Sequence, residues 1–128
     1  GEALLMPTRI YVKALKNVKN AVFDVKGCTH ITGGGFDENI PRMLPDNAVA
    51  VIKKDSYEVP EIFKLIAKKG NVSEDVMYNT FNMGIGMVCV VAKEEADTAL
   101  EAIHEMGEEA YVIGKIVSGE KEVEICLK

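Results

Sequence analysis

The sequence predicts a layered α/β domain, of the α+β kind, in which helices pack against a mixed β-sheet. Two observations support this fold class. Strand-like runs of β-branched and apolar residues alternate along the chain with stretches whose apolar residues recur at helical spacing. The last two strand-like runs then follow one another with only a turn between them. With 128 residues and no visible repeat or linker, the chain is expected to form one domain, residues 1–128.

The first half of the chain is expected to alternate between strand and helix. In order, the elements are a strand passing into a short helix at 8–20, a strand within 21–32, a turn at 33–35, a short helix at 36–44 and a strand at 47–54. The acidic residues Asp37 and Glu38 suit the positive first turn of the short helix. Pro41 is acceptable only near a helix start, so it limits that helix.

The second half contains the clearest helices. Residues 59–71 predict a helix with Pro60 at its first position and Gly70 as its end. Residues 73–81 predict one or two further turns capped by Ser73. The amphipathic stretch 93–107 is the strongest helical pattern, and Gly107 is expected to end it.

The remaining strands complete the predicted sheet. Residues 84–92 form a continuous apolar run, long enough for a central strand. Residues 110–119 and 121–128 predict two final strands, and the "SGEK" turn between them predicts a hairpin.

Composition and charge exclude several classes of function. The chain is 48% hydrophobic and 27% charged, as is ordinary for a soluble protein. A net charge of −5 argues against nucleic-acid or anionic-membrane binding. No uncharged apolar run approaches the roughly 18 residues of a membrane span. Cys28, Cys89 and Cys126 lie in strand-like apolar stretches without metal-ligand spacing, so we expect buried, reduced thiols, no metal site and a cytoplasmic location.

The run "TGGG", Thr32–Gly35, is the candidate binding site. Glycines allow another molecule to approach the main chain, and successive amides in such a turn can form an anion-binding nest. A helix that follows adds its free N–H groups and its dipole. The run predicts a seat for a phosphate, with the Thr32 hydroxyl as an extra donor. It is neither a P-loop nor a dinucleotide fingerprint, because both spacings are missing.

Neighbouring side chains extend this candidate site. Asn39 and Arg42 lie about one helical turn apart and could reach the same ligand. His30 either contacts the ligand or is a strand-end histidine satisfied by the backbone. A tight structural turn remains the alternative explanation of the glycines.

Three segments also carry a family resemblance. "LLMPTRIYVK", "HITGGGFDENIPRMLPD" and "MYNTFNMGIGMVCVV" occur in this order and are spread over most of the chain, from residue 4 to residue 91. Together they closely resemble the C-terminal domain of the aminoimidazole ribonucleotide synthetases, also called phosphoribosylformylglycinamidine cyclo-ligases. Thr8, Asn82 and Gly84 become weaker candidate site residues through this resemblance alone.

The resemblance implies an activity and its partners. Enzymes of this family use ATP and Mg²⁺ to close the imidazole ring of formylglycinamidine ribonucleotide in de novo purine synthesis, giving aminoimidazole ribonucleotide, ADP and phosphate. It further implies that an N-terminal domain, absent from this chain, supplies most ATP and metal contacts and much of a homodimer interface. The isolated domain is therefore expected to be inactive.

Several points stay open at this stage. The glycine run could face the substrate phosphate or the phosphates of ATP, and no general base is assigned. The chain could instead be a stand-alone α/β ligand-binding module. It could also belong to another member of the same ATP-dependent superfamily, of the selenophosphate synthetase or thiamine-monophosphate kinase type.

Overall fold

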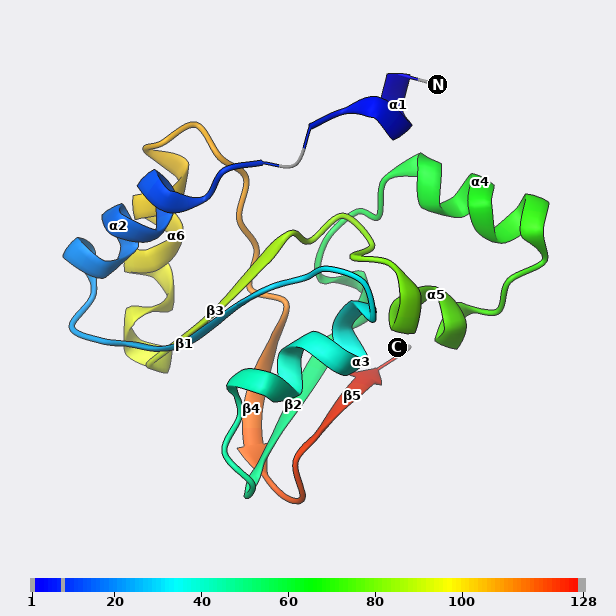
Figure 1. Cartoon of the computed structure of the whole chain (residues 1–128). Coiled ribbons are helices and arrows are strands. Elements are labelled where there is room, and N and C mark those ends of the chain that lie inside the picture. Colours follow the sequence, from blue (N-terminus) through cyan, green and yellow to red (C-terminus); the bar gives the residue numbers. More distant parts are fainter. Residues whose placement is uncertain (1, 8, 127–128) are drawn as a thin grey trace.

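The computed structural model describes residues 2–7 and 9–126 (Figure 1). The helices are α1 (Glu2–Leu5), α2 (Val12–Ala21), α3 (Gly35–Asn39), α4 (Glu61–Gly70), α5 (Glu74–Thr80) and α6 (Ala96–His104). The strands are β1 (Val25–His30), β2 (Ala48–Lys53), β3 (Met87–Val91), β4 (Gly114–Ser118) and β5 (Glu122–Cys126). Among the described residues, no helix has both the length and the hydropathy that crossing a bilayer requires.

The strands form two sheets, and helices pack beside both. One sheet is the antiparallel pair β1–β3, and the other is mixed, with β2 between antiparallel β4 and parallel β5. Helices α2 and α6 lie side by side at one end of β1–β3, while α3 lies in front of β2 and β5 (Figure 1). The predicted layered α/β architecture with a mixed sheet is confirmed.

The predicted hairpin between the last two strands is wrong. β4 and β5 do not pair with each other, because each pairs with a different edge of β2. The connection passes around the start of β2, where Gly119 N–H donates to the Asn47 carbonyl at 3.1 Å and Lys121 N–H to the Asp46 carbonyl at 3.2 Å. β2 is the most apolar and most buried strand of this sheet, so flanking it on both edges covers its backbone groups.

The prediction of a central strand at 84–92 is also wrong. β3 pairs with β1 alone among the described strands. Its residues are buried or partly buried on both faces, which explains the apolar run without pairing on both edges. Val88 of β3 joins the main core, and Val91 packs against the cluster between α2 and α6.

Other element limits differ in detail. The expected strand before α2 is not formed by the described residues 9–11. α3 is a short α-helix that continues as a 3-10 turn at Ile40–Met43, with Pro41 near the start of that turn. α4 begins after Pro60 and includes Gly70, and Asn71 in the left-handed conformation (φ 51°) follows it.

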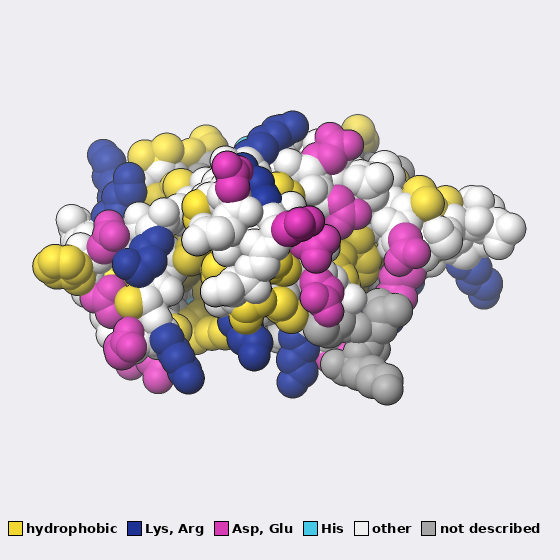
Figure 2. Space-filling model, turned by 90° about the horizontal axis from the view of Figure 1, so that it is seen from below, with side chains coloured by type: hydrophobic (Ala, Val, Ile, Leu, Met, Phe, Trp, Pro, Cys, Tyr) yellow, Lys and Arg dark blue, Asp and Glu magenta, His cyan; other side chains and the backbone are white. Residues whose placement is uncertain are grey.

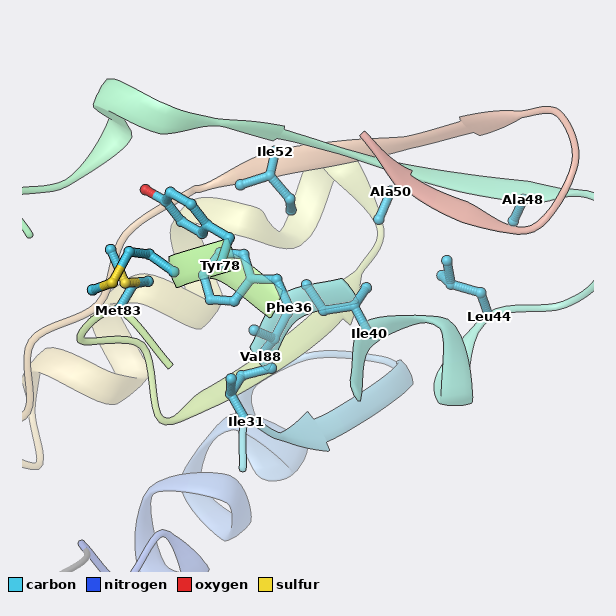
Figure 3. Close-up of a cluster of buried hydrophobic side chains, with 11 residues drawn as sticks. Ile31, Phe36, Ile40, Leu44, Ala48, Ala50, Ile52, Tyr78, Met83 and Val88 are labelled. Carbon is cyan, nitrogen blue, oxygen red and sulfur yellow. The ribbon is translucent and has the colours of Figure 1, made fainter. Parts of the chain in front are cut away.

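The main core lies between the two sheets (Figure 3). Phe36 and Ile40, both fully buried, project between Ile52 and Ala50 of β2 on one side and Ile31 and Val88 on the other. The ring of Phe36 meets that of Tyr78 edge-on, with centroids 5.3 Å apart. The residue that follows the glycine turn is thus anchored in the centre of the domain, which holds the turn at a constant position.

The expectation of buried cysteines is wrong for Cys28, which is exposed. Burial alternates along β1, and Cys28 lies on its outward face. Cys89 is partly buried, as expected of a thiol in an apolar strand. The side chain of Cys126 lies outside the described part of the structure.

Candidate functional site

The glycine turn joins β1 to α3, and two of its glycines are required by the fold. Gly34 has φ of +94° and Gly35 has φ of +59°, a region that residues with a side chain rarely adopt. A Cβ on Gly35 would lie 2.0 Å from the Tyr78 carbonyl oxygen, at the end of α5. The tight-turn explanation therefore accounts for these two positions.

Gly33 differs from its neighbours. It is exposed, its φ lies outside the left-handed region, and a Cβ built on it would meet nothing within 4 Å. Neither backbone strain nor packing within the described residues explains a glycine here. The bare backbone at this position faces open space.

That space is a hollow of about 360 Å³, which we call the loop hollow. It is lined by residues of β1, the glycine turn, α4 and the end of α5, namely His30, Ile31, Thr32, Gly33, Phe63, Thr80, Phe81 and Asn82. Four predicted site residues, His30, Thr32, Gly33 and Asn82, therefore meet in one place, although Asn82 is at least 49 residues from the other three in sequence. Thr80 and the two phenylalanines were missed, because their spacing indicated only helix faces.

Asn39 is a positioning residue inside the turn. It is 1% exposed, and its Nδ2 donates to the carbonyls of Gly35 at 2.7 Å, Thr32 at 3.1 Å and Gly33 at 3.3 Å. Its Oδ1 accepts from Thr32 Oγ1 and from Arg42 Nη1, each at 3.2 Å. The side chains of Asn39 and Arg42 thus support the turn from behind, and neither lines the loop hollow.

The backbone N–H groups of the turn differ in whether they already donate a hydrogen bond. Gly35 N–H donates to the Thr32 carbonyl at 3.0 Å and is not available to a ligand. The N–H groups of Gly33 and Gly34 have no acceptor among the described residues. The neighbouring carbonyls accept hydrogen bonds from the side chain of Asn39. The N–H groups of Gly33 and Gly34 therefore remain as donors for an oxygen of an external ligand.

The side chains at the rim add further donors. Asn82 Oδ1 accepts the N–H of Gly84 at 2.9 Å, which fixes the amide and leaves its NH₂ group as a donor. The His30 ring stands edge-on to Tyr11, with centroids 5.9 Å apart. Gly84 has φ of +95° and supports Asn82 without lining the hollow, and Thr8 lies outside the described residues.

A second hollow, of about 190 Å³, opens on the acidic side of α3. It is lined by Asp37, Glu74, Asp75, Tyr78, Val123 and Ile125. Burial, together with the carboxylates of Asp75 and Glu38, raises the pKa of Asp37. This concentration of negative charge disfavours an anion in the second hollow, whereas the lining of the loop hollow contains no carboxylate.

The rest of the surface provides no general attraction for anions. On the face shown in Figure 2, acidic and basic side chains are interspersed. The net charge is −5, so an anionic ligand depends on the local donors of the loop hollow.

Comparisons with known proteins agree with the resemblance seen in the sequence. The family model described as "AIR synthase related protein, C-terminal domain" matches residues 1–126. Similar relatives come from Lachnospira eligens (63% identical over 126 residues), Agathobacter rectalis (59% over 125) and Lachnoclostridium phytofermentans (53% over 126). Each is named phosphoribosylformylglycinamidine cyclo-ligase. The matches cover 98% of this chain but 37% of each relative.

Proposed function

The chain belongs to the family of AIR synthase related protein C-terminal domains, and from this premise we propose that it is the C-terminal domain of a phosphoribosylformylglycinamidine cyclo-ligase. The full-length protein would convert formylglycinamidine ribonucleotide to aminoimidazole ribonucleotide in the cytoplasm, with ATP giving ADP and phosphate. Named relatives at 46–63% identity support this activity over the selenophosphate synthetase and thiamine-monophosphate kinase types.

Within that enzyme, the loop hollow binds a phosphate group of the ribonucleotide substrate. The observation that carries this proposal is Gly33, an exposed glycine that the described structure does not require. The free amides of Gly33 and Gly34 and the NH₂ group of Asn82 supply donors, and each hydrogen bond to a charged group contributes about 1.5–3 kcal/mol. Two or three such bonds are enough to offset a net charge that solvent largely screens.

The residues of this chain bind and orient the substrate. Holding one end of the ribonucleotide positions its reacting end and removes part of the entropic barrier to ring closure. ATP supplies the phosphoryl group that activates the formyl oxygen. His30 lies at the rim and is the proton donor to the bound anion in this proposal.

Mg²⁺ and ATP are assigned to the N-terminal domain. The described residues contain no group of three or more His, Cys, Asp or Glu side chains arranged to hold a metal ion. The loop hollow offers neutral donors that suit a phosphate oxygen, and its lining has no carboxylate for Mg²⁺. The homodimer of the full-length enzyme remains part of the same proposal.

Gly33→Ala in the full-length protein is expected to weaken substrate binding about tenfold or more, because the methyl group occupies the approach to the amides. Stability should change by less than about 0.5 kcal/mol, since the position is exposed and unstrained. Calorimetric titration with formylglycinamidine ribonucleotide, and separately with an ATP analogue, measures the effect. Weaker binding of the ATP analogue alone would assign the hollow to the nucleotide.

Gly27→Ala is the matched control for this test. Gly27 lies in β1 with φ outside the left-handed region, and its added Cβ would make ordinary contacts of 3.5 Å with Met43. It does not line the loop hollow. Unchanged affinity of Gly33→Ala for both ligands, with the control behaving as wild type, would contradict the proposal that the loop hollow binds a phosphate group.

The 128-residue chain alone is expected to show no cyclisation activity, because it spans 37% of the length of its cyclo-ligase relatives. An assay of product formation with substrate, ATP and Mg²⁺ compares the chain with the full-length protein. Turnover by the purified chain would contradict the assignment of ATP binding to another domain.

A further inference from the structure

Two cysteines that the proposed function does not use lie opposite each other. Cys28 of β1 is paired with Cys89 of β3 in the antiparallel ladder. They are 61 residues apart in sequence, so only the strand pairing brings them together. Residues that face each other in such a ladder project their side chains to the same face of the sheet.

The hydrogen bonds of the ladder define the kind of pair. Ile31 N–H donates to the Gly86 carbonyl at 2.8 Å, so these two residues occupy a hydrogen-bonded position. Positions alternate along an antiparallel ladder, and Cys28 and Cys89 lie three steps away on their strands. They are therefore a non-hydrogen-bonded pair, in which Cα atoms are about 4.5 Å apart. This separation falls within the range of about 4.4–6.8 Å that a disulfide spans.

The two thiols differ in access. Cys28 is exposed, while Cys89 is partly buried, and both are free. Burial raises the pKa of Cys89 to about 11, with a further increase from Cys28 and an opposing effect of Lys19 on α2. A reagent therefore reaches Cys28 first, and Cys89 is next to the sulfur that has reacted.

We propose that Cys28 and Cys89 are a thiol-oxidation site that forms a reversible cross-strand disulfide with a small-molecule disulfide as oxidant. The Cys28 thiolate attacks one sulfur of glutathione disulfide and releases a glutathione thiolate. Cys89, after losing its proton to solvent, attacks the Cys28 sulfur of the mixed disulfide and releases the second glutathione. The protein loses two hydrogens, and one glutathione disulfide becomes two glutathione thiols.

The bond would link β1, whose last residue His30 lines the loop hollow, to its neighbour β3. His30 and Met87 form the non-hydrogen-bonded pair two positions further along the ladder, on the same face as the cysteines. A covalent link between β1 and β3 restricts the unfolded chain and is expected to raise the midpoint of thermal unfolding by about 5 °C or more. This effect does not depend on which ligand occupies the hollow.

The test uses the full-length protein that contains this chain. The native protein is incubated with glutathione disulfide, its remaining thiols are alkylated, and its peptides are mapped by mass spectrometry before and after reduction. A peptide pair linked through Cys28 and Cys89 is expected, together with the rise in unfolding temperature, and dithiothreitol should reverse both. Cys28→Ser and Cys89→Ser should each abolish the link, whereas Cys126→Ser should retain it.

Three results would overturn the proposal. One is a stable glutathione adduct on Cys28 with Cys89 still open to alkylation. Another is linkage of Cys28 between two protein molecules. The third is native protein in which neither thiol reacts although both react in urea.

Discussion

Gly35→Ala is expected to destabilise the domain by about 4 kcal/mol or more, which places it among the most severe single substitutions. The new Cβ would lie 2.0 Å from the Tyr78 carbonyl oxygen and 2.8 Å from that of Phe81. Both obstacles are backbone atoms at the end of α5 and cannot rotate away. The left-handed conformation of Gly35 adds roughly 1–2 kcal/mol for any residue with a side chain.

The surrounding packing prevents relief of this clash. Phe36, the next residue, is fully buried between the sheets, and α3 packs directly against α5. Urea denaturation of the variant measures the loss, and Gly33→Ala in the same turn is its control. A loss below about 1 kcal/mol would show that the turn can move away from α5, contrary to the described packing.

Asn39→Ala is expected to cost about 3 kcal/mol, because it removes the donor for three carbonyls at once. The shortest of these bonds, 2.7 Å to the Gly35 carbonyl, is buried and has no access to water. The truncation also frees the Thr32 hydroxyl and Arg42, which both donate to Asn39 Oδ1. The turn should then lose its defined conformation before the rest of the domain unfolds.

Denaturant unfolding measures the stability change, and amide hydrogen exchange of residues 32–35 measures the order of the turn. Asn79→Ala is the matched control, since Asn79 is an exposed asparagine of α5 and should change stability by less than about 0.5 kcal/mol. Retention of full stability by Asn39→Ala would mean that water replaces the amide and that Asn39 does not position the turn.

Local patterns predicted the helices and the position of the glycine turn well. The apolar spacing of α4 and α6 depends only on neighbouring residues, so both helices lie within the predicted ranges. The three consecutive glycines marked the turn for the same reason. Strand pairing depends on residues far apart in sequence, and both errors of sheet topology, the hairpin and the central strand, arose there.

The direction in which a polar side chain points could not be predicted from the sequence either. Asparagine is a residue type that can bind a ligand, yet the side-chain amide of Asn39 donates its hydrogen bonds to carbonyls of the neighbouring turn. Spacing indicates that a side chain can reach a turn, but the fold decides whether it approaches from the solvent or from the core. The relation between Cys28 and Cys89 is of the same kind, because only register places them together.

The sequence by itself determined the family, the order of most elements and the place of the glycine turn, because each of these depends on patterns of residues that are contiguous in the chain. Only the tertiary structure separated the fold-required Gly34 and Gly35 from the unconstrained Gly33, and only it brought Asn82 to the loop hollow. The physical reason is steric. Whether a missing side chain leaves room for a neighbour or for a ligand depends on the atoms of distant segments that pack around it.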